Sequence, residues 1–125
     1  MTDLEEVRKI ALSLLETNAE NTGFGVLNNG KYKGFAWVWM QRVEPKKPRV
    51  PCPEVLAIRT EDIGSRDALI AAEPNKFFTE PHYQNFPAVL VRLQEIEFDE
   101  LRELLIEGWR CQAPKALVRE YDNAL

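Results

Sequence analysis

An Asn29-Gly30 pair between two strand-like runs constrains the fold of this chain more than any other sequence feature. This dipeptide favours the tight two-residue turn of a β-hairpin, because both of its residues tolerate positive backbone φ angles. The pair therefore predicts two antiparallel strands, near residues 24–28 and 32–42. Two further runs, Val55 to Arg59 and Ala88 to Leu93, predict a third and a fourth strand.

Helical patterns precede and follow these strands. Apolar residues recur at helical spacing over residues 3–16, and Thr2 and Glu5 have the spacing of a capping box. Ser65 is expected to cap a short helix that Pro74 ends, and Asp99 is expected to cap the clearest helix. Pro114 is well placed to open a last short helix. This order of elements predicts an α+β fold with an antiparallel sheet.

The length of 125 residues fits one domain, which we expect to span residues 1–125. No stretch approaches the roughly 18 apolar residues of a membrane helix, and the start MTDLEEVRKI lacks the features of a secretory signal. We therefore expect a cytoplasmic, monomeric protein with no membrane partner. The two cysteines, Cys52 and Cys111, are expected to be free structural thiols.

Positive charge is concentrated in one part of an acidic chain. The formal net charge is -4, but residues 31–59 hold seven basic and two acidic side chains. Within them, the segment EPKKPRVPCPE at residues 44–54 carries four of the eight prolines. Because proline cannot donate a ladder hydrogen bond, we expect this segment to be a stiff loop that projects from the fold.

Side-chain alternation assigns the strand residues to two faces. In the strand at residues 88–93, one face holds Val89, Val91 and Leu93, and the other holds Ala88, Leu90 and Arg92. In the strand at residues 55–59, one face holds Leu56 and Ile58, and the other holds Val55, Ala57 and Arg59. Phe35, Trp37 and Trp39 oppose Ala36, Val38, Met40 and Arg42. Each strand thus has a bulky face and a smaller face that ends in an arginine. If the bulky faces align, Trp37 and Trp39 belong to the core instead of forming an open platform for nucleobases. The open face would then hold three arginines, Arg42, Arg59 and Arg92. Alternatively, these side chains extend separately from the ends of their strands and form no common surface.

No catalytic or metal-binding constellation is apparent. The chain has one histidine, His82, and two serines, so no nucleophile and base can be paired by spacing. His82, Cys52 and Cys111 do not have the spacing of zinc ligands. The carboxylates that begin with Asp99 are typical of a helix start. We therefore expect a non-enzymatic protein without a cofactor or metal.

Four segments carry a resemblance to a known family. The segments are, in order along the chain, KGFAW, PNKFFTEPHY, PAVLVRL and GWRCQAPK. Together with the leading helix, they resemble the MmcQ/YjbR-like family of small bacterial proteins. The resemblance implies an α+β domain with hairpin wings around an antiparallel sheet, packed against helices and related in shape to type III secretion chaperones and frataxin-like folds. Members of that family are commonly labelled DNA-binding.

Two functional hypotheses follow. In the first, a basic wing and strand arginines contact phosphates of duplex DNA weakly and in a salt-sensitive manner; the residues are Lys31, Lys33, Arg42, Lys46, Lys47, Arg49, Arg59 and Arg92. In the second, the chain binds a protein or a small ligand, with FFTEPHY as the lip of a pocket. For that pocket we expect Lys76, His82 and Tyr83 to gather at the edge of the largest concavity.

Overall fold

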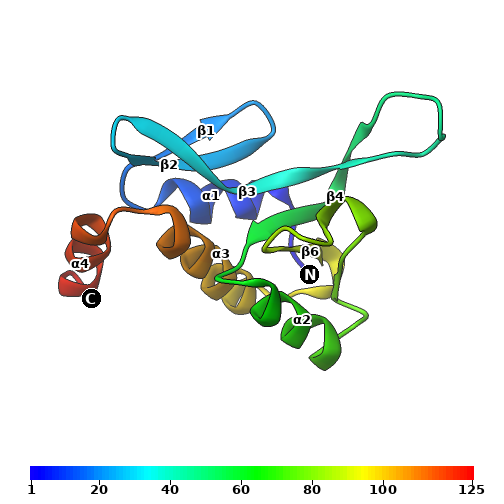
Figure 1. The fold of residues 1–125 in the computed structure, drawn as a ribbon. Helices are drawn as coiled ribbons and strands as arrows, with labels where there is room; N and C mark the ends of the chain where they lie inside the picture. Colours follow the sequence, from blue (N-terminus) through cyan, green and yellow to red (C-terminus); the bar gives the residue numbers. More distant parts are fainter.

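A computed structural model describes residues 1–125 and shows a single α+β domain with an open, six-stranded antiparallel sheet (Figure 1). The strand order is β1-β2-β3-β4-β6-β5. The strands are β1 (Thr17–Glu20), β2 (Gly23–Asn28), β3 (Lys31–Gln41), β4 (Val50–Arg59), β5 (Phe77–Phe78) and β6 (Ala88–Arg92). The predicted fold class and all four predicted strands are confirmed, and the Asn29-Gly30 turn joins β2 to β3, with both residues at positive φ.

Four α-helices accompany the sheet: α1 (Leu4–Leu12), α2 (Ile63–Ala72), α3 (Phe98–Gln112) and α4 (Lys115–Asn123). Two short 3₁₀ turns, η1 (Pro81–Tyr83) and η2 (Leu93–Glu95), flank β6. The helices α1 and α3 cover one face of the sheet (Figure 1). None of the helices has both the length and the apolar character that crossing a bilayer requires.

The predicted helix caps are wrong by one to three residues. Asp3, and not Thr2, caps α1 by accepting a hydrogen bond from the Glu6 amide, while the Thr2 hydroxyl is buried and donates to the Leu93 carbonyl. Asp62 caps α2 by accepting from the Ser65 amide. In α3 the cap position is Glu97, whose side chain makes no capping bond. Several acceptors compete near each helix start, and packing decides which one is used.

Residues 44–49 form the predicted loop, but the second half of the proline-rich segment forms a strand in its place. β4 begins at Val50, so Pro51 and Pro53 lie in an antiparallel ribbon with the end of β3. β6 pairs with β4 only from Val55 onward. The prolines therefore face an unpaired edge, where a missing N–H costs no ladder bond. This ribbon projects beyond the rest of the sheet, as Figure 1 shows. The short strands β1 and β5 were not predicted from the sequence.

The main core lies between the sheet and the helices α1 and α3. Trp109 of α3 is fully buried, and its indole Nε1 donates to the Leu15 carbonyl. Leu56 and Ile58 of β4 and Val89 and Val91 of β6 point into this core, as their predicted alternation required. Burying this many apolar side chains supplies most of the driving force for folding.

A single extra residue reverses the predicted faces of β3. Phe24 pairs with Ala36 and Gly25 pairs with Gly34, so Phe35 is bulged out of the β2 pairing. Phe35 and Ala36 are consequently both buried in the core on the helix side. Trp37 and Trp39 are turned to the opposite face and are only half-buried. The prediction that both tryptophans are core residues is therefore wrong.

A close helix–sheet contact at Gly108 yields a stability prediction. A β-carbon at Gly108 of α3 would lie 3.1 Å from the Phe35 carbonyl oxygen and 3.1 Å from Ile58 Cγ2. We expect Gly108→Ala to lower the free energy of unfolding by about 1–3 kcal/mol through overpacking, although alanine is the better helix former. Urea denaturation measures the change.

The exposed Gly64 of α2 is the matched control for this substitution. A β-carbon there would meet only the Asp62 side chain, at 3.4 Å. Gly64→Ala should therefore raise stability by about 0.5–1 kcal/mol, the helix-propensity gain alone. Equal effects of the two substitutions would contradict the close contact.

Candidate functional site

The tip of the β3–β4 hairpin is the most basic surface segment. Between Arg42 and Arg49 it holds four basic side chains and one carboxylate, Glu44. By contrast, η2 and most of α3, from Leu93 to Glu107, hold six carboxylates and one arginine. The helix α3 covers one face of the sheet, whereas the hairpin tip projects beyond the sheet, so the acidic side chains lie away from the tip (Figure 1). An anion is therefore attracted to the hairpin in preference to the helix layer.

Two of the four basic residues at the tip hold the hairpin in shape. Arg42 Nη1 donates to the carbonyls of Pro45, at 3.2 Å, and Lys47, at 2.9 Å. Arg49 Nη1 donates to the Met40 carbonyl at 2.8 Å and forms an ion pair with Glu80 at 3.3 Å. Both arginines therefore have structural partners.

The other two basic residues at the tip are free. Lys46 and Lys47 are exposed, and their ammonium groups form no ion pair or hydrogen bond within the chain. They stand on a backbone that prolines and the two arginines hold in place. A positive charge on such a segment loses little conformational freedom when it meets an anion.

The remaining lysines of the predicted ribbon lie far from this tip. Lys31 and Lys33 are exposed at the start of β3, whose 11 residues end at Gln41. A strand of this length separates its ends by roughly 30 Å. The structure therefore does not bring Lys31 and Lys33 together with Lys46 and Lys47, and the predicted basic ribbon consists of two separate patches.

The face of the sheet opposite α1 and α3 carries a cluster of aromatic and arginine side chains. Three buried aliphatic residues, Val55, Ala57 and Leu90, form its floor. We call the surface above this floor the aromatic face; it is formed by Trp37, Trp39, Phe78, Tyr83 and Phe86 with Arg59 and Arg92. The predicted sharing of one face by Arg59 and Arg92 is thus seen, whereas Arg42 belongs to the hairpin tip.

The arginines of this face lie over aromatic rings. The Arg92 guanidinium carbon is 4.2 Å from the Phe78 ring centroid, and Arg92 Nη1 donates to the carbonyls of Pro74 and Asn75. The Arg59 guanidinium carbon is 5.2 Å from the Phe86 centroid. Cation–π contacts of this kind fix the planes of both groups.

A loop, residues 79–87, supplies Tyr83 and Phe86 of the aromatic face, and both contact Trp37. The buried Arg66 of α2 holds the loop, because Nη1 donates to the carbonyls of Tyr83, Gln84 and Phe86 at 2.8 to 3.3 Å. The Tyr83 hydroxyl accepts a hydrogen bond from Trp37 Nε1 at 3.1 Å. Trp37 is therefore covered by the loop, while Trp39 packs edge-on against Phe78, with ring centroids 5.5 Å apart.

The predicted pocket of Lys76, His82 and Tyr83 does not form. Lys76 is buried against α3, where its ammonium group binds Glu100 and Glu73. These two hydrogen bonds, that to Glu100 first, raise the pKa of Lys76. His82 is exposed and contacts the Tyr83 ring, with centroids 5.4 Å apart. The Lys76 ammonium group lies on the helix side of the sheet, whereas His82 and Tyr83 belong to the loop on the other face.

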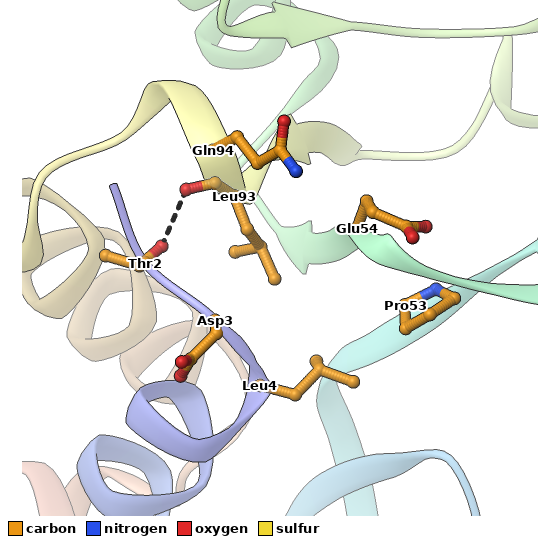
Figure 2. A pocket seen from close by; sticks show the side chains of 7 residues that line it. All are labelled: Thr2, Asp3, Leu4, Pro53, Glu54, Leu93 and Gln94. Carbon is orange, nitrogen blue, oxygen red and sulfur yellow. Dashed lines mark hydrogen bonds between the residues drawn. The ribbon is translucent and has the colours of Figure 1, made fainter.

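The hollow at the start of the chain is lined by none of these three residues. This hollow of about 250 Å³ is lined by Thr2, Asp3, Leu4, Pro53, Glu54, Leu93 and Gln94 (Figure 2). Its two carboxylates are partly engaged, since Asp3 caps α1 and Glu54 accepts a hydrogen bond from the Cys52 thiol. Burial, followed by the contact with Glu54, raises the pKa of Cys52, so this thiol is protonated at neutral pH.

Sequence reasoning missed the aromatic face because five consecutive apolar residues, Phe35 to Trp39, carry no alternating pattern. Such a run is compatible with either phase of the strand, and only the bulge at Phe35 selects one. Phe78 was expected only as part of the FFTEPHY pocket lip, and Phe86 and Arg66 were not predicted, since their loop and helix meet the sheet only through tertiary packing.

Comparisons with known proteins agree with this fold. The chain resembles the crystal structure of the Deinococcus radiodurans protein DR2400, a DUF419 domain, with a TM-score of 0.68 at 17% identity; the match covers 98% of this chain and 89% of that one. This likeness shows a shared α+β fold. No family model matches the chain.

Uncharacterized mycobacterial proteins are similar in sequence. Two from Mycobacterium tuberculosis strains and one from Mycobacterium bovis are each 49% identical over 71 residues, or 57% of this chain. The match covers 55% of these proteins, so the chain spans about half the length of the curated relatives it matches.

The Arg66 anchor leads to a prediction about the loop over the aromatic face. Arg66→Met removes the three hydrogen bonds to loop carbonyls and should lower stability by about 1–3 kcal/mol. Amide hydrogen exchange should accelerate in residues 79–87 more than in β6. As a control, Arg119→Met changes an exposed arginine of α4 and should leave both measurements unchanged. Unchanged exchange in the loop of Arg66→Met would contradict the anchoring role.

Proposed function

We propose that this chain binds nucleic acid and that the tip of its β3–β4 hairpin contacts backbone phosphates. The observation that carries the proposal is the pair of exposed lysines, Lys46 and Lys47, without anionic partners on a braced hairpin. Lysine and arginine contacts to phosphates supply most of the affinity of nonspecific nucleic-acid binding. Arg49 adds to the local potential, although Glu80 offsets part of its charge.

The resemblance to the MmcQ/YjbR-like family supports the same proposal, because its members are commonly labelled DNA-binding. Membership of that family is part of the proposal. The β2–β3 and β3–β4 hairpins would then be the two wings of the family fold. A nucleic-acid partner would also place the protein in the cytoplasm.

Binding of this kind should be weak and sensitive to salt. The tip offers between two and four phosphate contacts, and the net charge of -4 opposes association with a polyanion. The logarithm of the affinity should fall with the logarithm of the salt concentration, with a slope between about -1.8 and -3.6. Nonspecific dissociation constants should lie around 10⁻⁴ to 10⁻⁶ M at physiological salt.

One observation favours a second candidate, a protein partner. Half-exposed tryptophan, tyrosine and arginine side chains, such as those of the aromatic face, dominate the energetics of many protein interfaces. That candidate gives no role to the free lysines at the hairpin tip. The basic charge next to the aromatic side chains therefore favours nucleic acid.

Charge reversal at the hairpin tip tests the proposal. Lys46→Glu combined with Lys47→Glu should weaken binding to a fluorescent duplex at least about tenfold, because two attractions become repulsions. The salt slope should become shallower by about 1.8, the value of two lost contacts. Fluorescence anisotropy at two salt concentrations measures both quantities. Arg49 stays unchanged in this variant, since it holds the hairpin through Met40 and Glu80.

The matched control reverses the lysines at the other end of the same strand. Lys31→Glu combined with Lys33→Glu makes the same change in net charge on equally exposed residues. We expect a small loss of affinity and an unchanged salt slope. Equal losses in the two variants would show that net charge matters and the hairpin tip does not, and an unaffected tip variant would refute the proposal.

A further inference from the structure

The uncovered part of the aromatic face lies directly beside the hairpin tip. Trp39 precedes Gln41, the last residue of β3, by two positions, which is about 7 Å along a strand. The loop of residues 79–87 covers Trp37 through Tyr83 and Phe86. The other end of the face, formed by Trp39, Phe78 and Arg92, lies outside these contacts. Lys46 and Lys47 lie in the turn that follows Gln41, so a strand that places a phosphate on one of them reaches this end of the face within a few nucleotides.

The groups at this end match the chemistry of an unpaired base. Trp39 and Phe78 are half-buried rings, and the Arg92 guanidinium makes a cation–π contact with Phe78. Arg92 uses only Nη1 in hydrogen bonds within the chain, which leaves its other nitrogens for a base edge or a phosphate. Bases stack on aromatic rings and on arginine planes in proteins that bind single strands.

Two donors on this face lack acceptors. The Nε1 of Trp39 and the Nε of Arg59 are shielded from solvent and have no hydrogen-bond partner in the chain. Buried donors without partners are rare in folded proteins, and both of those found here belong to the aromatic face.

The carboxylates around the face limit the length of a bound strand. Glu54 and Glu95 line a hollow with Arg92 at this same end of the face. A phosphate is repelled there, so the backbone of the strand is expected to run from the Trp39 end toward Lys46 and Lys47. The resulting footprint is short, on the order of two or three nucleotides.

We propose that the aromatic face is a base-stacking site for single-stranded nucleic acid, with Trp39 and the Arg92 guanidinium, which covers Phe78, beneath the base and the hairpin lysines on phosphates further along the strand. This inference rests on the proposed function and specifies its substrate class. A duplex offers phosphates to the same lysines but keeps its bases stacked and paired, and extracting one costs a few kcal/mol. The single strand is therefore preferred.

The test compares oligonucleotides that differ only in their bases. Labelled oligomers of about 12 nucleotides are used as a thymidine single strand, as a duplex and as an abasic strand with the same phosphates. At about 50 mM salt the thymidine strand should bind the wild-type protein about 5- to 100-fold more tightly than the abasic strand, the range expected for one stacked base. The duplex should resemble the abasic strand.

Truncation of Trp39 should remove this gain in affinity of the thymidine strand over the abasic strand. Trp39→Ala should weaken binding of the thymidine strand by about 5- to 100-fold and leave binding of the abasic strand unchanged. Tyr32→Ala is the matched control, because Tyr32 is an exposed aromatic residue at the far end of β3, with 43% of its surface accessible. It should bind all three oligomers as the wild type does. Thermal unfolding confirms that each variant is folded.

The outcomes separate this inference from the proposed function. Equal affinity of the wild type for the thymidine and abasic strands overturns the base-stacking site, even if Trp39→Ala fails to fold, because that comparison uses no variant. The proposed function survives in that case if reversal of Lys46 and Lys47 still weakens binding. Binding of none of the oligomers overturns both proposals and leaves the protein-partner candidate.

Discussion

The bulge at Phe35 is the constraint on which the rest of this structure depends. It places Phe35 and Ala36 together in the core beneath α3, where the Phe35 carbonyl meets Gly108 at close range. The same extra residue turns Trp37 and Trp39 to the opposite face. One inserted residue thereby supplies both a tight helix contact and an aromatic surface, since a shift by one residue exchanges the two faces of a strand.

The sheet separates two environments as a result. Apolar side chains fill the side that α1 and α3 cover, and the acidic segment of η2 and α3 lies there too. The other side has only a thin floor of Val55, Ala57 and Leu90 under its aromatic side chains. Such a layer is too small to be a second core, and its half-exposed rings and arginines have the composition of a binding surface.

The loop over the aromatic face connects this surface to the basic hairpin. Arg66 fixes the loop from α2, and the ion pair between Glu80 and Arg49 joins the loop to the hairpin tip. An anion that approaches Arg49 must therefore compete with Glu80. Because both side chains of the pair are only about one-fifth to one-quarter exposed, water screens the pair incompletely, and Glu80 offsets part of the positive charge of Arg49.

The sequence by itself determined the positions of the main strands and helices and the faces of β4 and β6, because local turn chemistry and side-chain alternation encode them. It also located the positive charge near Lys46 and Lys47. Only the tertiary structure decided the face of β3, the strand within the proline-rich segment, and the separation of Lys76 from His82. These features depend on the bulge opposite β2, on the free edge of β4 and on the carboxylates of Glu73 and Glu100. Each of these features depends on residues that are distant in sequence, or on a choice between local conformations of similar free energy. A local sequence pattern does not determine which of them forms.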